Sequence, residues 1–215
     1  IVKGDQAGIT VTAATPSVYF STPAATDVIT VAGGLANTAV TASVDAASSG
    51  VCSVAVAGNK VTMTALRVGD CVIKITKAGN AAVNDYIETL TIPVLKTKQS
   101  AFSASASPSA LTYADNSTIT STINAVGGSG TGLISYMLSE DSAEICSLNE
   151  NVITVITGGD CVVIVAKAGD VNYSDASTTI TIKIAKGNQS ALSIDAAETT
   201  LTYNKDEAVA TELTV

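Results

Sequence analysis

The chain contains an internal repeat of about 90 residues. Residues 68–80 read VGDCVIKITKAGN and residues 158–170 read GGDCVVIVAKAGD, so Gly-Asp-Cys and Lys-Ala-Gly recur at matching positions. Three glutamines begin the copies, at Gln6, Gln99 and Gln189, which are 93 and 90 positions apart. Because a unit of this length is the size of a small domain, the repeat predicts tandem domains rather than one large one.

These markers divide the chain into two full repeats, residues 6–98 and 99–188. Residues 1–5 are predicted to be the end of a preceding repeat, and residues 189–215 to be the first strands of a third, with a strand at 208–215. The apolar pattern of that strand presupposes a facing sheet and rests on Ala208, Val209, Leu213 and Val215. Such a fragment cannot bury a core alone. We therefore expect it to be completed by more of the same polypeptide or by a neighbouring chain.

Within each repeat, apolar and polar residues alternate with a period of two. Cys71, Ile73 and Ile75 alternate with Val72, Lys74 and Thr76 in one run that is typical of the others. The runs are short and end at Gly-Asn, Gly-Asp or Gly-Gly turn signals. In the second repeat we predict strands near 100–106, 118–126 and 132–138, around Cys146, and at 151–156, 160–166 and 177–185. About seven strands without a helix predict an all-β fold of tandem immunoglobulin-like β-sandwiches.

Composition supports strands and excludes several functions. Thr, Val and Ile make up a third of the residues, and these β-branched side chains suit a pleated surface. The chain has no His, which excludes His-based catalytic triads and His-ligated metal sites. A net charge of −8 disfavours nucleic acid as a partner. The apolar runs are too short for a membrane span. We expect no enzymatic activity, no cofactor and no bound metal.

The pattern of Gly-Asp-Cys, alternating Ile/Val, Lys-Ala-Gly-Asp/Asn and a closing Thr-Ile-Thr-Ile strand resembles the bacterial immunoglobulin-like (Big-type) repeats of large surface proteins and adhesins. The resemblance covers nearly the whole chain. The first repeat departs from it at Val83, where the second has Tyr173. The resemblance implies an extracellular spacer or adhesive stalk on a bacterial surface, or a secreted one, and it specifies no ligand.

Two cysteines recur in each full repeat and predict one disulfide per repeat. Cys52 and Cys71 are 19 residues apart, and Cys146 and Cys161 are 15 apart. The pair recurs while its spacing drifts, as expected for partners that meet in space. A four-Cys zinc site would need two Cys-x-x-Cys pairs, which are absent. Buried free thiols are the alternative. Disulfides imply an oxidising compartment.

Acidic residues at the turns are weak calcium candidates. They are Asp70, Asp160, Asp170 and Asp175. Ca²⁺ prefers carboxylate and carbonyl oxygens, but no Asp-x-Asp-x-Asp loop is present. Asp also stabilises turns by bonding to nearby backbone. We therefore favour a turn role.

Three other groups of side chains bear on binding. Tyr113, Tyr136 and Tyr203 are possible sugar-stacking platforms, although the first and last share one repeat position, which favours packing. Lys77 and Lys167 follow a strand and are expected to be solvated; a crosslink to Asn would need burial beside a carboxyl group. On strand 160–166, Val162 and Ile164 lie opposite the core face, and this second apolar face is a candidate surface for lateral association.

The leading functional hypothesis is a non-enzymatic stalk or fibre segment in an adhesin-like array, whose partners are further repeats of the same chain or neighbouring copies. A second hypothesis is a filament subunit in which another chain completes the third repeat. A third is a carbohydrate- or host-binding module. The length of the natural polypeptide distinguishes the first hypothesis from the second: many further repeats favour a stalk, and a mature chain that ends near Val215 favours a filament subunit.

Overall fold

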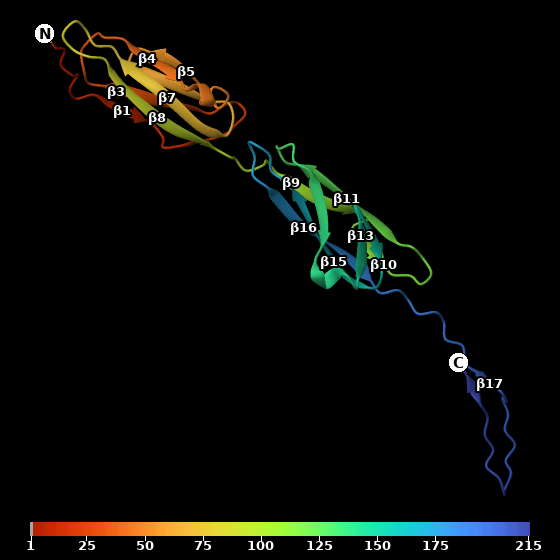
Figure 1. Ribbon diagram of the computed structural model, residues 1–215. Helices are drawn as coiled ribbons and strands as arrows, with labels where there is room; N and C mark the ends of the chain where they lie inside the picture. Colours follow the sequence, from red (N-terminus) through yellow and green to blue (C-terminus); the bar gives the residue numbers. More distant parts are fainter. Residues whose placement is uncertain (1) are drawn as a thin grey trace.

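Two β-sandwiches follow one another along the chain and lie end to end in the computed structural model, which describes residues 2–215 (Figure 1). A thin hairpin extends beyond the second sandwich. Ile1, the first residue of the strand end expected at 1–5, lies outside the described residues. Residues 2–5 form no continuous strand, and their one ladder contact is an isolated bridge between Gly4 and Val83.

The first sandwich consists of two four-stranded sheets. One sheet has the order β1 (Thr10–Ala13), β3 (Thr26–Ala32), β6 (Lys60–Ala65), β5 (Cys52–Ala57). The other has the order β2 (Val18–Tyr19), β8 (Tyr86–Leu95), β7 (Gly69–Lys77), β4 (Val40–Val44). A single 3₁₀ turn, η1 (Ala46–Ser48), connects β4 to β5 and so carries the chain from one sheet to the other.

The second sandwich repeats this topology strand for strand. Its first sheet has the order β9 (Phe102–Ser107), β11 (Thr120–Gly127), β14 (Val152–Val155), β13 (Cys146–Asn149). Its second sheet has the order β10 (Ala110–Thr112), β16 (Ala176–Ala185), β15 (Gly159–Lys167), β12 (Ile134–Leu138). The turn η2 (Glu140–Ser142) occupies the place of η1. This order confirms the predicted all-β fold of tandem immunoglobulin-like sandwiches.

An eighth strand in each sandwich was not predicted. The first strand stops after a few residues, and the chain then crosses to the opposite sheet as β2 or β10. There it pairs in parallel with the last strand, β8 or β16, whereas the other pairings are antiparallel. The expected strands from 118–126 onward correspond to β11–β16, with ends within two residues where a range was predicted. A run of two or three paired residues is too short to give a period-two signal.

Each sandwich has its own core, built by the alternation along its strands. In β7, Cys71, Ile73 and Ile75 are fully buried and their neighbours face outward. In β15, Cys161 and Val163 have the same role in a separate cluster. Burying one Val or Ile side chain stabilises a fold by roughly 1.5–3 kcal/mol. Two separate clusters therefore support two cooperative units.

The C-terminal segment forms only a minimal hairpin. Strands β17 (Asp195–Ala196) and β18 (Leu213–Thr214) pair over two residues each. The strand expected at 208–215 is therefore wrong in extent, because only Leu213 and Thr214 are paired. With no second sheet to pack on, the apolar side chains of this segment stay exposed; they are Leu192, Ile194, Leu201, Tyr203, Val209, Leu213 and Val215. Among residues 2–215 no helix has the length and apolar character needed to cross a membrane.

Candidate functional site

The four cysteines form two disulfides, each within one sandwich. Cys52 on β5 is bonded to Cys71 on β7, and Cys146 on β13 to Cys161 on β15, with Cα–Cα separations of 5.7 and 6.0 Å. These are the pairs that the spacing predicts, and the described residues contain no free cysteine. In both repeats the two strands belong to opposite sheets. Each bond therefore joins the two layers of its sandwich through the core.

The acidic candidates are used by the turns in which they lie. Asp170 Oδ1 accepts hydrogen bonds from the backbone N–H groups of Asn172 (2.8 Å) and Tyr173 (2.9 Å), and Oδ2 accepts from the N–H of Thr131 (2.8 Å). Asp175 Oδ1 accepts from the N–H of Gly169 at 2.7 Å. The backbone donors of Thr131 and Asn172 lower the pKa of Asp170 to about 2. This geometry favours the turn role over a calcium role.

The other two acidic candidates lie on the surface. Asp160 forms an exposed ion pair with Lys183 at 3.3 Å, and Asp70 contributes its backbone carbonyl to a hydrogen bond from Ser48 Oγ at 2.8 Å. In the part of the chain that the structure describes, no three His, Cys, Asp or Glu side chains gather as a metal site would require.

Lys77 and Lys167 are the last residues of β7 and β15, but they are not solvated. The expectation that both side chains lie in solvent is therefore wrong. Lys77 is 2% exposed because it continues the inward-facing series Cys71, Ile73, Ile75 to the end of β7. Its Nζ is 3.5 Å from the carbonyl oxygen of Thr38. The half-buried Lys167 donates through Nζ to the carbonyls of Gly127 (3.1 Å) and Gly128 (3.4 Å). A long side chain can cover the end of a core while its ammonium group reaches polar atoms at the rim.

The glutamines that begin the two full repeats, Gln6 and Gln99, have a structural role that the sequence did not reveal. Gln6 Nε2 donates to the carbonyls of Lys77 (3.0 Å) and Ala78 (3.2 Å), and its Oε1 accepts from the N–H of Leu35 (3.2 Å). Gln99 makes the corresponding bonds to the carbonyls of Lys167 and Ala168 and to the N–H of Gly130. In each repeat this side chain therefore fastens the entering segment to the end of β7 or β15. Recurrence at the repeat boundary was the signal that could have identified it.

The two sandwiches contact each other through a joint, which we define as Phe20, Val68, Thr97, Asn172 and Tyr173. The N–H of Val68 donates to Asn172 Oδ1 at 3.1 Å. The rings of Phe20 and Tyr173 meet edge to face, with centroids 5.6 Å apart and planes at 87°. The linker residue Thr97 pairs with Tyr173 in an isolated parallel bridge. Beside the joint lies a cavity of about 480 Å³ lined by Tyr19, Lys96, Thr97, Lys98 and Ser174.

The proposed sugar-stacking tyrosines are in three different environments. Tyr113 and Tyr136 are half-buried and pack on the core of the second sandwich. The hydroxyl of Tyr113 donates to Asp115 Oδ1 at 2.7 Å, and this bond raises the pKa of the Tyr113 phenol. Tyr203 is 85% exposed in the C-terminal segment. The shared repeat position of Tyr113 and Tyr203 thus gives a packed side chain only where a sandwich is present.

The outer face of β15 has the apolar character expected from the sequence. Val162 and Ile164 are half-buried among Thr181, Thr179 and Met137 on neighbouring strands, and Met137 is 60% exposed. The corresponding face of β7 has Lys74 where β15 has Ile164. Lateral association through this face stays a prediction.

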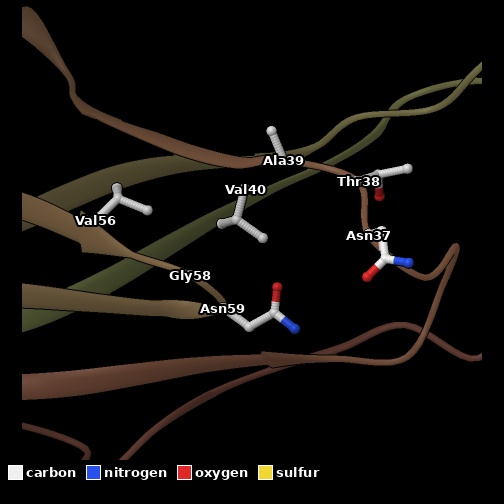
Figure 2. A pocket seen from close by; sticks show the side chains of 7 residues that line it. All are labelled: Asn37, Thr38, Ala39, Val40, Val56, Gly58 and Asn59. Atoms are coloured by element: carbon white, nitrogen blue, oxygen red, sulfur yellow. The ribbon is translucent and has the colours of Figure 1, made fainter.

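A shallow hollow of about 700 Å³ lies at the edge of the first sandwich, between the segment before β4 and the turn that joins β5 to β6 (Figure 2). In Figure 2 the amides of Asn37 and Asn59 lie toward one end and Val56 toward the other. The hollow is lined by Asn37, Thr38, Ala39, Val40, Val56, Gly58 and Asn59. None of these residues was a candidate in the sequence.

Comparison with known proteins gives structural likenesses at low identity. No family model matches the chain, and no curated protein matches it. A protocadherin gammaB7 EC3-6 cis-dimer structure is 12% identical, with a TM-score of 0.38; the match covers 93% of this chain and 55% of that one. The match thus spans about half the length of that solved chain.

Two further solved structures are similar at comparable values. The C-terminal 282-residue fragment of intimin, solved with the intimin-binding domain of the translocated intimin receptor, is 15% identical, with a TM-score of 0.34. The match covers 89% of this chain and 67% of that one. Yersinia pseudotuberculosis InvD is 15% identical, with a TM-score of 0.33, and the match covers 94% of this chain and 66% of that one. At these values we take no function from the likenesses, and we base the fold class on the sheet order of the chain itself.

Proposed function

We propose that this chain is a non-enzymatic spacer segment of an extracellular surface protein, which separates other parts of that protein and carries tension along its length. The observation that carries the proposal is the serial arrangement of two sandwiches. The chain enters the second sandwich at one end and leaves it at the other (Figure 1). In such an arrangement tension passes through every domain.

The pairing of the terminal strands supports a load-bearing role. β10 follows the first strand and lies at the exit end of the second sandwich, beside the end of its last strand, β16, and the two are parallel over Ala110–Thr112. Pulling the chain ends apart slides these strands along each other, so their hydrogen bonds are strained together rather than one by one. β2 and β8 are paired in the same way in the first sandwich.

The disulfides support the same role and the proposed compartment. Each covalently closes part of its sandwich, so a domain that opens under load cannot extend fully. Structural disulfides persist in oxidising environments, which supports an extracellular location. Assignment to a bacterial surface adhesin rests on the sequence resemblance.

Single-molecule force spectroscopy on the 215-residue chain, held at its two ends, tests the proposal. We expect two unfolding steps, one for each sandwich, each with a resolved force peak. Reduction should lengthen the step of the first sandwich by about 65 Å, because 19 residues at roughly 3.5 Å each are released. The second step should lengthen by about 50 Å for 15 residues. Extension without force peaks would contradict a load-bearing role.

A second candidate, a filament subunit assembled by strand complementation, is favoured by one observation. Leu213 and Val215 are 65% and 79% exposed beside short unpaired strand edges. Another chain could cover both by adding strands. Sedimentation of the chain and of an L213D/V215D variant distinguishes the two: an oligomer that this variant dissociates supports the filament, and a monomer at all concentrations rejects it.

A further inference from the structure

The geometry points to Asn172 and Tyr173 as a coupling site that fixes the second sandwich in one orientation on the first. Both side chains lie on the loop between β15 and β16 and contact the preceding sandwich. Asn172 accepts the hydrogen bond from Val68, and Tyr173 meets Phe20. The site goes beyond a spacer role, because it concerns the orientation of the domains in solution whether or not the chain carries load.

The backbone part of the joint is generic. The N–H of Thr97 donates to the carbonyl of Asn172 at 3.1 Å, and the N–H of Ser174 donates to the carbonyl of Thr97 at 2.9 Å. At the entry of the first sandwich, Gly4 makes the same two bonds with Ala82 (3.0 Å) and Asn84 (2.8 Å). Every full repeat in this chain therefore pairs its entering segment with this loop.

The loop conformation is also common to both repeats. Asp170 Oδ1 accepts from the two N–H groups that follow it at positions 172 and 173, and Asn80 Oδ1 accepts from those of Ala82 and Val83. The first repeat thus presents Ala82 and Val83 where the second presents Asn172 and Tyr173. Only the second pair has a side chain that can accept a hydrogen bond, Asn172, and one that can form an aromatic contact, Tyr173.

The partner surface lies at the far end of a sandwich. Phe20 directly follows β2, and its N–H donates to the carbonyl of Leu95 at the end of β8. In the second sandwich Tyr113 occupies this place, since its N–H donates to the carbonyl of Ala185. An aromatic ring thus stands at the exit end of both sandwiches. The partner that fits it is a following repeat whose loop carries a polar residue and then an aromatic one.

Two exchanges between the repeats test the coupling with little risk to folding. The N172A/Y173V variant gives the second repeat the side chains that the first already carries in the same loop. The A82N/V83Y variant makes the opposite change on the first repeat, away from the joint, and serves as the matched control. Thermal unfolding of each variant verifies that both sandwiches remain folded.

The readout is the distance distribution between spin labels on non-natural residues at Thr30 and Thr179, which are exposed strand positions on different sandwiches. We expect a narrow distribution for the natural chain and the A82N/V83Y control. Removing the side-chain contacts leaves a small interface, for which relative domain motion is the norm, so N172A/Y173V should broaden the distribution roughly twofold. Equal widths for the natural chain and N172A/Y173V, whether narrow or broad, would overturn the proposal.

Discussion

Gln99 and Lys167, 68 residues apart, together hold the double-glycine turn at the entry of the second sandwich. Gln99 Nε2 donates to the carbonyl of Lys167 at 3.3 Å, while Lys167 Nζ donates to the carbonyl of Gly127 at 3.1 Å. Both glycines of this turn have positive φ, and a Cβ on Gly127 would lie 1.9 Å from the backbone oxygen of Ala101, so the turn has no room for a larger residue there. The entering linker, the turn and the end of β15 are thus one connected unit.

Replacement of Gln99 by Ala should therefore destabilise the second sandwich alone. The carbonyls of Lys167 and Ala168 and the N–H of Gly130 lose their partner, and such a loss costs about 1–3 kcal/mol where the groups are shielded from water. Chemical denaturation, with the two sandwiches resolved as separate transitions, measures the change. Gln189→Ala is the matched control, because it lies in the exposed C-terminal segment. A similar effect of both substitutions would contradict the role of Gln99.

The disulfides should be found by non-reducing peptide mapping as Cys52–Cys71 and Cys146–Cys161 only. In the chain-entropy model, closing loops of 19 and 15 residues stabilises each sandwich by roughly 3 kcal/mol. The C52A/C71A variant should lower the stability of the first sandwich by about that amount and leave the second unchanged, because their cores are separate. A pair that links the two repeats, or four free thiols, would refute this assignment.

The stability of the second sandwich should depend on pH through Asp170. Its pKa is about 2 in the folded protein, against 3.8 as the ordinary value. Because the folded pKa is the lower one, the carboxylate stabilises the fold above pH 3.8, and this contribution is lost as the pH falls through about 2. Denaturation of the natural chain and of Asp170→Asn should differ above pH 4 and converge toward pH 2.

The choice of Asn for this test has a precedent in the chain itself. Asn80 holds the same turn in the first repeat through the same two acceptor bonds. Asp170→Asn should therefore keep the loop and remove only the charge and the two hydrogen bonds that Thr131 donates to Oδ2 through its N–H and its hydroxyl. A stability difference that does not change between pH 5 and pH 2 would show that the Asp170 carboxylate is not the titrating group.

Much of the fold could be predicted from the sequence because period-two alternation reports which face of a strand is buried. Cys71, Ile73 and Ile75 follow this rule, and so do their counterparts on β15. Lys77 obeys the same alternation, because its position in β7 faces inward. The expectation of a solvated lysine was wrong because it rested on the charge of the side chain and not on its place in the strand. The short parallel strands β2 and β10 give no periodic signal at all.

The joint was less accessible to sequence reasoning than the core. In the sequence Tyr173 stands out only because the first repeat has Val83 at the same position. The contact of Tyr173 with Phe20 depends on how one sandwich lies against the next, which no pattern within a single repeat records. The glutamines were visible as markers, but their bonds reach residues about 70 positions away.

The last prediction concerns residues 189–215, which should be the least protected part of the 215-residue chain. β17 and β18 share two paired residues on each side, and a two-stranded hairpin of that length is marginal in water. Leu192, Tyr203 and Val215 are each more than 70% exposed, so no core holds the segment. Hydrogen exchange on a dilute monomer should show amides 208–215 exchanging close to the unfolded rate, while amides 161–166 in β15 exchange slowly. Protection of 208–215 equal to that of 161–166 would mean that the segment is stable on its own. Slow exchange that appears only at high protein concentration would instead show that another copy of the chain covers it.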